Sequence, residues 1–496
     1  MGIKQLLRIL CFSLIFFLLL ANSQILFQDK WVSLSNSYAR VRQFYQEEQR
    51  PEVVFIGSSH VHYNINPLQI FDEYGITSYD FASPDQDFSA SRLYIEESIR
   101  MGPPKVIVLE VLNMTRFVNS EVRHRQCLDQ LPLSLNKLKY LLYSFERNKL
   151  HKSDVKYDSV VSYLFPTLRY HDRWDKLTKN DLDWDPEIPY YHGATHYHGY
   201  GPHYYTVEAD FSGYDEPIAF DNSILEENKK IFSDIVAMCE KSGVELLLLK
   251  TPSPSWRRDK HDLIQRWADK YHIPFLDYKD FLEEIGIDAT TDFMDKSHHL
   301  NDNGVTKVSR HLGKYLQEKY QLPDHRGDSR YAVWETDYQI YEQDKASYFL
   351  SHETDWSRYL EKLKDPNYTI YVAAKDNIGG VLHPELAKQL CLIREDRGVT
   401  IEGKTHSSYL LVIDKGEVIY EKISDQAISY ESETGKHRVE MESAHFKAGN
   451  KASIKIDYKE YFVDRRGIGI VVYDNILEDV VDCVTFDIHG GGTAYR

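Results

Sequence analysis

Four short apolar runs, separated by helical stretches, set the strongest limit on how this chain can fold. They span residues 52–56, 105–110, 244–250 and 273–277. Runs of this length are typical of strands that are buried on both faces of a sheet. Strands that alternate with helices indicate a parallel sheet covered by helices. We therefore predict an α/β domain over about residues 50–325, with ligands bound at the carboxyl ends of its strands.

Two regions depart from this alternation. Residues 118–220 are rich in Tyr, His, Asp and Trp, and we interpret them as an insertion or a lid over the site. Over residues 335–496, short β-like segments dominate and predict a separate β-rich, sandwich-like domain. A chain of 496 residues is long enough for two or three domains.

The first 27 residues predict a signal peptide or a signal anchor. Lys4 and Arg8 precede an apolar run over residues 9–20, which is the pattern of a secretion signal. A membrane span needs about 20 residues, and residues 25–27 can extend the run to that length. Residues 21–23 also fit a cleavage site. Both alternatives place the rest of the chain outside the cytoplasm.

Charge and cysteine content argue against two classes of protein. The net charge is −17 and no dense run of Lys and Arg follows the N-terminus, so binding of nucleic acid is not expected. The five cysteines contain no CxxC pair, so the sequence predicts neither a zinc site nor a dense disulfide framework. We expect mostly buried thiols, and one long-range disulfide stays open.

Two segments carry residues suited to acyl transfer. Ser59 lies two residues after Gly57, directly behind the first apolar run, and Asp295, His298 and His299 lie before the last helix of the domain. Acyl transfer by a hydroxyl needs a serine at a tight turn, an imidazole that accepts its proton and a carboxylate that orients the imidazole. A serine behind a strand lies at the carboxyl edge of the sheet, where a loop can deliver the other two groups.

These motifs resemble those of the SGNH (GDSL-like) hydrolase superfamily over about residues 50–325. Gly57-Ser58-Ser59 is similar to the first family block, Gly-Asp-Ser, and Asp295-x-x-His298 to the last block, Asp-x-x-His. The resemblance implies a flavodoxin-like, three-layer fold. It also implies that Ser59 is the nucleophile, Asp295 the orienting carboxylate and His298 the base.

The last block leaves the identity of the base open. His299-Leu300-Asn301, followed by Gly304, is also a common ending in this superfamily, so His299 is the alternative base. The three-residue spacing from the aspartate slightly favours His298.

The inner family blocks, which supply oxyanion donors, are less clear. Gln86 lies where the first donor loop is expected, and Asn113 follows the second apolar run. The backbone N–H of Ser59 is a further donor, and one such donor contributes about 3 kcal/mol of transition-state stabilisation.

The chain looks most like membrane-anchored bacterial members that resemble the acyl-transfer proteins of cell-wall D-alanylation and polysaccharide O-acetylation. This resemblance implies a carbohydrate or acyl-ester substrate, room for an envelope protein as partner, and no metal or organic cofactor. Trp256, behind the third apolar run, is a candidate for substrate binding. Arg173 and Trp174 are two more, although their cluster also reads as an ion-pair network around Asp172.

A histidine-rich stretch offers a rival interpretation. His196 and His198, with His192 or His203 as a third ligand, can reach one metal ion. The stretch lacks a carboxylate or a cysteine, so lid or sugar contacts are the alternative.

The C-terminal region resembles the interleukin-like EMT inducer (ILEI, FAM3-like) domain. Residues 466–474, followed by 480–482 and 486–487, are similar to its strand pair, and upstream segments to its other half in reversed order. We expect a circularly permuted or looser relative. The resemblance implies a β-sandwich that binds glycan or protein, and the alternative is a purely structural domain.

Our hypothesis from the sequence is a bacterial cell-surface SGNH-type serine esterase or O-acyltransferase. It acts on acetyl-type esters of surface or secreted polysaccharide, with Ser59 as nucleophile, His298 or His299 as general base, and Asp295 behind the imidazole. The alternative is a catalytically inactive protein that binds glycan or assists envelope assembly.

Overall fold

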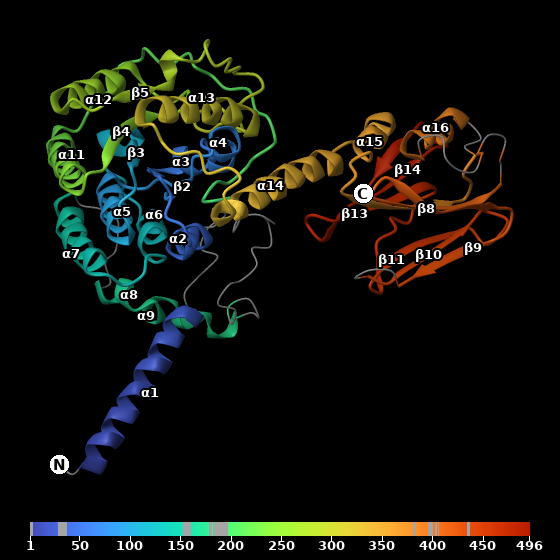
Figure 1. The fold of residues 1–496 in the computed structure, drawn as a ribbon, viewed down its shortest axis with the longest axis horizontal. Coiled ribbons are helices and arrows are strands. Elements are labelled where there is room, and N and C mark those ends of the chain that lie inside the picture. Colours follow the sequence, from blue (N-terminus) through green and yellow to red (C-terminus); the bar gives the residue numbers. More distant parts are fainter. Residues whose placement is uncertain are drawn as a thin grey trace. The chain divides into compact units, whose positions relative to one another are not determined.

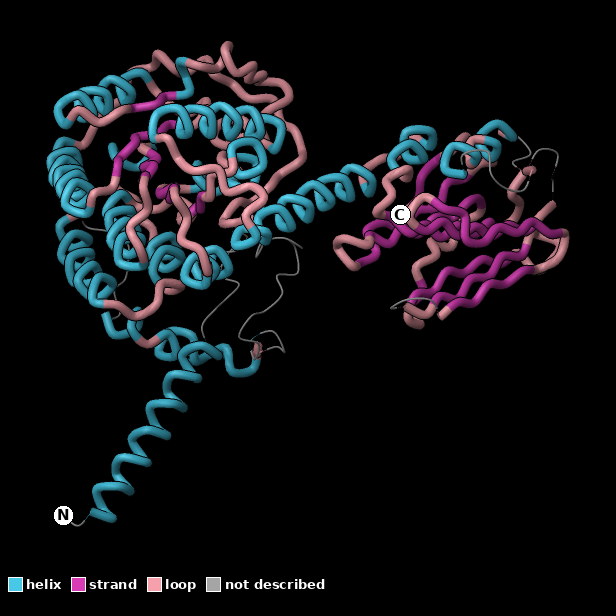
Figure 2. Tube along the Cα trace, in the orientation of Figure 1, coloured by secondary structure: helices cyan, strands magenta, loops and turns pink. Residues whose placement is uncertain are grey.

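The computed structural model describes residues 3–27, 37–151, 160–177, 181, 197–379, 383–394, 400–401, 404, 406–433 and 437–496. The chain divides into two compact units, Met1–Tyr338 and Gln339–Arg496. The first unit holds a parallel sheet, and the second holds two antiparallel sheets. Figure 1 follows the chain through both units, and Figure 2 distinguishes their helices and strands.

A five-stranded parallel sheet forms the centre of the first unit. In spatial order its strands are β2 (Ser78–Asp80), β1 (Val53–Ile56), β3 (Val106–Glu110), β4 (Glu245–Lys250) and β5 (Phe275–Asp277). Each pair of neighbours is parallel. The chain order 2-1-3-4-5 reverses direction between β1 and β3, and doubly wound sheets bind ligands in the crevice at such a point.

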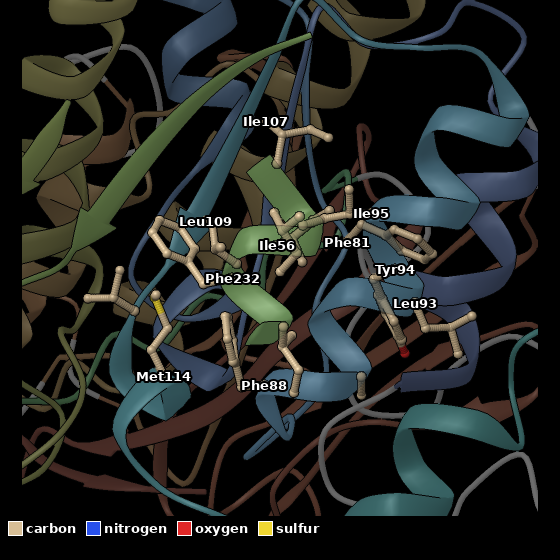
Figure 3. Packing of buried hydrophobic residues seen from close by; sticks show 14 of the residues in the cluster. Ile56, Phe81, Phe88, Leu93, Tyr94, Ile95, Ile107, Leu109, Met114 and Phe232 are labelled. Carbon is tan, nitrogen blue, oxygen red and sulfur yellow. The ribbon is translucent and has the colours of Figure 1, made fainter. Parts of the chain in front are cut away.

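Helices cover both faces of this sheet. On one face, α5 (Phe88–Met101), α11 (Asn222–Ser242) and α12 (Arg258–Tyr271) share a buried core with alternate residues of the strands. Figure 3 shows part of this core, including Ile56, Ile107, Leu109, Leu93, Ile95 and Phe232. On the other face, α4 (Pro67–Tyr74) packs against α13 (Asp302–Tyr320). The strand residues between those of the first core are buried as well, as expected for a sheet with two covered faces.

The N-terminal helix α1 (Ile3–Phe27) is the one helix of the described residues that is long and apolar enough to cross a membrane. Its segment Lys4–Gln24 has a mean hydropathy of 2.1, and none of it is buried by the rest of the chain.

The other helical segments of the first unit are shorter than α1. They are α2 (Ser37–Gln46), α3 (Ser59–His62), α6 (Glu121–Leu128), α7 (Leu135–Leu150), α8 (Val160–Leu164), α9 (Pro166–Tyr170) and the 3-10 turns η1 (Leu112–Thr115), η2 (His171–Asp175), η3 (Tyr278–Asp280) and η4 (Ser329–Tyr331). The helix α14 (Ala332–Ser351) contains the boundary between the two units.

The predicted insertion, residues 118–220, has two parts with different surroundings. The helices α6 and α7 bury Leu128 and Leu141 in the same core as α5. The later part runs beside the loop that precedes α13, where the Val207 N–H donates to the Phe293 carbonyl at 2.8 Å. Among the described residues of the insertion, those of this later part make the hydrogen bonds to the loop of the predicted site.

The second unit contains a six-stranded and a four-stranded sheet. The first has the order β15 (Thr493–Tyr495), β14 (Asp479–Asp487), β13 (Gly467–Asp474), β6 (Tyr368–Lys375), β7 (Ser408–Asp414) and β8 (Glu417–Ser424). The second has the order β12 (Lys459–Glu460), β11 (Lys451–Ile456), β10 (Val439–Ala444) and β9 (Ile428–Ser432). The two sheets share one core, and helices α15 (Trp356–Lys362), α16 (Pro384–Lys388) and α17 (Cys391–Arg394) cover the other face of the larger sheet.

The prediction of an α/β chain with a parallel sheet is confirmed. The four apolar runs correspond to β1, β3, β4 and β5, whereas β2 was not predicted. This edge strand is three residues long and carries polar residues at both ends, Ser78 and Asp80, so it has no apolar run to recognise.

Candidate active site

The turn behind β1 presents Ser59 at the first residue of α3. Ser58 caps this short helix by accepting the His60 N–H at 3.3 Å, and its hydroxyl donates to Glu110 Oε2 at 3.1 Å. A Cβ on Gly57 would lie 2.6 Å from the Cβ of Glu110, so only glycine lets the turn pass this close to the end of β3. The turn therefore lies at the point where the strand order reverses.

The loop before α13 brings His299 to this serine. The Nε2 of His299 lies 2.8 Å from Ser59 Oγ, and its Nδ1 lies 2.6 Å from Asp295 Oδ2. Ionised Asp295 can only accept, so Nδ1 carries the proton and Nε2 of the neutral ring is free to accept the serine proton. Ser59, His299 and Asp295 thus form a hydrogen-bonded chain from a hydroxyl to a carboxylate.

Asp295 is held in its ionised form. Partial burial raises the pKa of this carboxyl, but the hydrogen bond from His299 and the attraction of its ring outweigh burial, and the pKa lies well below its ordinary value. Backbone N–H groups of Ser297 and His298 also donate to Asp295 Oδ1, at 2.9 and 2.6 Å, and stabilise the charge further.

The preference for His298 as the base is wrong in this structure. The Nδ1 of His298 lies 3.0 Å from Ser255 Oγ, and this ring makes no hydrogen bond to Ser59. The physical reason is that the loop wraps around the aspartate oxygen, which also accepts the His299 N–H at 3.2 Å. That turn directs the ring four residues after Asp295, rather than three, back over the carboxylate.

A buried asparagine joins the segments that carry these groups. Asn64, just behind α3, donates to Thr251 Oγ1 at 2.9 Å and accepts the Leu300 N–H at 3.0 Å. Asn301 then caps α13 by accepting the N–H groups of Asn303 and Gly304. These bonds fix the loop of His299 relative to the turn of Ser59.

A lysine without solvent contact lies behind the turn. The side chain of Lys250, at the end of β4, is 0% exposed, and its Nζ lies 3.1 Å from Glu110 Oε1 and 2.7 Å from His60 Nδ1. Burial lowers the pKa of Lys250, and Glu110 opposes that shift. Burial, and then the charge of Lys250, lower the pKa of His60 well below its ordinary value, so His60 is neutral. The His60 ring is centred 5.1 Å from that of His299.

The two oxyanion candidates contact each other. Asn113 Nδ2 donates to the Gln86 carbonyl at 2.6 Å, and Gln86 Nε2 donates to Ser91 Oγ at 3.1 Å. Neither side chain makes a hydrogen bond to Ser59 in the described part of the chain. The loop before Gln86 does lie beside the nucleophile turn, because the Ser83 N–H approaches the Gly57 carbonyl at 3.4 Å. The Ser59 N–H has no hydrogen-bond partner among the described residues.

The prediction that Trp256 binds substrate is wrong. Its side chain is only 1% exposed, and its indole N–H donates to Asp277 at 2.7 Å. It packs over the buried network, since Lys250 Nζ lies 5.5 Å from its ring centre.

Arg173 and Trp174 lie on η2, a different segment from those that carry Ser59, His299 and Asp295. Arg173 donates to the carbonyl of Phe27, the last residue of α1, at 3.1 Å and to Asp181 at 2.9 Å. Trp174 is 72% exposed on η2. Substrate binding by these two residues stays a prediction, and Arg173 is bonded to the end of α1 and to Asp181.

The histidine-rich stretch is only partly described. His192 and His196 lie outside the described residues. His198 Nδ1 lies 3.1 Å from Glu47 and its Nε2 lies 3.2 Å from Asp337, so both ring nitrogens already have partners. The described residues contain no group of three or more side chains suited to a metal ion, and all five cysteines are free.

The buried contacts among Lys250, Glu110 and His60 were not predicted from the sequence. A signal was present, because Lys250 and Glu110 are charged residues at the carboxyl ends of two apolar runs that neighbour each other in the sheet. Charged side chains at such positions of parallel strands meet at the same edge.

No family model matches the chain, and no curated protein matches it. The arrangement itself can move a proton from Ser59 Oγ to His299 Nε2 while Asp295 balances the positive ring.

Proposed function

We propose that the first unit is an SGNH-type serine esterase or O-acyltransferase. The observation that carries the proposal is the chain of hydrogen bonds from Ser59 through His299 to Asp295. The strand order 2-1-3-4-5 and the place of Ser59 behind β1 support membership of the SGNH superfamily. The same hydrogen-bonded chain serves hydrolysis and transfer, because both reactions pass through an acyl-enzyme.

The proposed reaction has two half-reactions. Ser59 Oγ attacks the ester carbonyl while its proton passes to His299 Nε2. When the tetrahedral intermediate collapses, the ester C–O bond breaks and the same proton goes to the departing alcohol, which leaves an acyl-serine. Water or a sugar hydroxyl then attacks the acyl-serine, again with His299 as base, and Ser59 regains its proton. The unpartnered Ser59 N–H is available to the oxyanion.

The substrate class follows from the resemblance and from the first helix. We propose an acetyl-type ester of surface or secreted polysaccharide, met outside the cytoplasm, with α1 retained as a signal anchor. The retained helix is supported by a contact that cleavage after residues 21–23 would remove, since Ser23 Oγ lies 3.4 Å from Thr167 Oγ1. An envelope protein as partner fits the same setting.

A second candidate function, binding of a glycan, is favoured by a cavity in the second unit. The cavity has a volume of about 580 Å³, within the range of small-molecule sites, and three of its lining residues are tyrosines. The Tyr371 hydroxyl has no hydrogen-bond partner among the described residues, whereas Tyr473 is fixed by His437 at 2.8 Å. Tyr430 stacks on Tyr420 with ring centres 4.6 Å apart. Flat aromatic faces beside the free hydroxyl of Tyr371 suit a neutral sugar ring.

Turnover of p-nitrophenyl acetate separates the two functions. Wild type should release nitrophenol, Ser59→Ala should not, and Ser212→Ala, an exposed serine of a turn, should match wild type. A wild-type protein without turnover would leave only the binding role. That role predicts retention of the full chain on an immobilised neutral polysaccharide, weakened by Tyr473→Ala and not by Tyr458→Ala, which lies outside the cavity.

A further inference from the structure

The last turn of α1 is bonded to a short helical segment, α8–α9–η2. Thr167 on α9 contacts two α1 side chains: its N–H donates to Gln24 Oε1 at 2.8 Å, and its hydroxyl lies 3.4 Å from Ser23 Oγ. Arg173 on η2 donates to the Phe27 carbonyl at 3.1 Å. These bonds satisfy polar groups at the end of an apolar helix and fix the segment beside the point where α1 ends (Figure 1).

The same segment exposes large apolar side chains. Its surface carries Val161, Phe165, Leu168 and Trp174, which we call the apolar ledge. Leu168 is 56% exposed and Trp174 is 72% exposed. Four such residues within fifteen positions form a concentration that a surface facing only water does not need.

The charges around the ledge nearly cancel. Arg169, Arg173 and Lys176 are offset by Asp172 and Asp175, so this segment lacks the excess of cations that a purely electrostatic membrane contact requires. An apolar occupant with polar groups at its edge fits better. Tryptophan favours such a boundary, since its ring is apolar and its N–H can meet polar headgroups.

We propose that the apolar ledge lies in the interfacial layer of the bilayer that α1 crosses. The argument for this occupant is continuity, because the ledge is bonded to the end of the membrane-spanning helix and begins where that helix leaves the hydrocarbon. The inference rests on the proposed retention of α1. Its consequence is that two contacts, a span and a ledge, hold the catalytic unit in one orientation, so the acyl donor and acceptor must meet Ser59 close to the membrane surface.

The test uses the full chain in bilayers with brominated acyl chains. The fluorescence of Trp174 is isolated as the difference between wild type and Trp174→Phe. We expect this difference signal to fall about twofold relative to unbrominated bilayers and to resist aqueous iodide. A Phe165→Glu/Leu168→Glu variant should lose the quenching by bromine, and Val333→Glu, a site of similar exposure on α14, should keep it.

Two outcomes would overturn the proposal. Quenching of Trp174 by iodide but not by bromine would place the ledge in water. Shielding of Trp174 from both quenchers, with cross-links to a second copy or another protein, would replace the lipid by a protein partner. Turnover of p-nitrophenyl acetate by the same preparations tests Ser59 separately. A failure of the proposed membrane contact can therefore be distinguished from a failure of the proposed esterase activity.

Discussion

Lys250 Nζ lies 2.7 Å from Nδ1 of His60, the residue that follows the proposed nucleophile. The lysine also bonds to Glu110, which accepts the Ser58 hydroxyl, so one buried cation ties the ends of β3 and β4 to the nucleophile turn. A donor at Nδ1 places the proton of neutral His60 on its other nitrogen. We infer that Lys250 is a positioning residue for Ser59.

Replacing Lys250 by Met should destabilise the protein by about 3 kcal/mol or more, because Glu110 would keep a buried charge without its partner. Urea unfolding measures this loss. Below the unfolding range, kcat for p-nitrophenyl acetate should fall more than KM changes, since the turn that holds Ser59 is loosened.

The Lys250→Met/Glu110→Gln double variant should recover part of the stability, because the unpaired charge is removed. Lys270→Met, an exposed lysine on α12, provides the control and should behave as wild type. A neutral effect of Lys250→Met on both stability and kcat would contradict the positioning role.

Alanine substitutions of the two neighbouring histidines should lower kcat by very different factors. His299→Ala removes the group 2.8 Å from Ser59 Oγ and should lower kcat by about 10³-fold, the usual contribution of a general base. His298→Ala removes a hydrogen bond to Ser255 and none to Ser59, and should change kcat less than about tenfold. Steady-state kinetics of both variants decides the assignment, and equal losses would show that the loop exchanges the two rings.

Asp295→Asn should keep the fold and lose most of the activity, by about 10³-fold in kcat, because an amide no longer fixes the proton on His299 Nδ1. Because the pKa of Asp295 is lowered in the folded protein, its contribution to the free energy of unfolding changes with pH in one direction. The carboxylate contributes above its ordinary pKa of about 4 and loses that contribution as the pH falls towards its lower folded value. The wild type should therefore lose more stability than Asp295→Asn between pH 5 and about 2. Parallel Tm curves would refute the lowered pKa of Asp295.

For His198 we expect stability to depend on pH with the opposite sign. Burial opposes its charge, but hydrogen bonds to Asp337 and Glu47 outweigh burial and raise the pKa of His198 to about 9. The protonated ring stabilises the first unit fully below its unfolded pKa of about 6.5, and the contribution, on the order of 3 kcal/mol, is lost as the pH rises through about 9.

The check is the Tm of wild type and of His198→Gln between pH 6 and about 9.5. The difference between the two proteins should shrink as the pH rises. A constant difference would mean that His198 does not change its charge over this range.

The sequence allowed prediction of those features that depend on apolar runs and turns. The four runs located β1, β3, β4 and β5 within one or two residues, and Gly57 before Ser59 located the turn. Helices α5, α11 and α12 lie between these strands, where the sequence indicated helical stretches, because apolar periodicity reports burial directly.

Features set by tertiary geometry were not predictable. Two histidines in succession differ only in the path of their loop, and the bonds to Asp295 that fix that path involve backbone N–H groups. Trp256 follows a strand, where parallel sheets place their ligand-binding residues, but its indole N–H is bound to Asp277 at the end of β5. The role of Arg173 depends on a helix end some 146 positions earlier.

The most direct test of the account is to map the residue that a serine-directed fluorophosphonate modifies, by mass spectrometry of peptides from the full chain. The account predicts one adduct, on Ser59, that is absent from Ser59→Ala and strongly reduced in His299→Ala. An unmodified Ser59 in folded wild-type protein, or an adduct on another residue that survives Ser59→Ala, would contradict it.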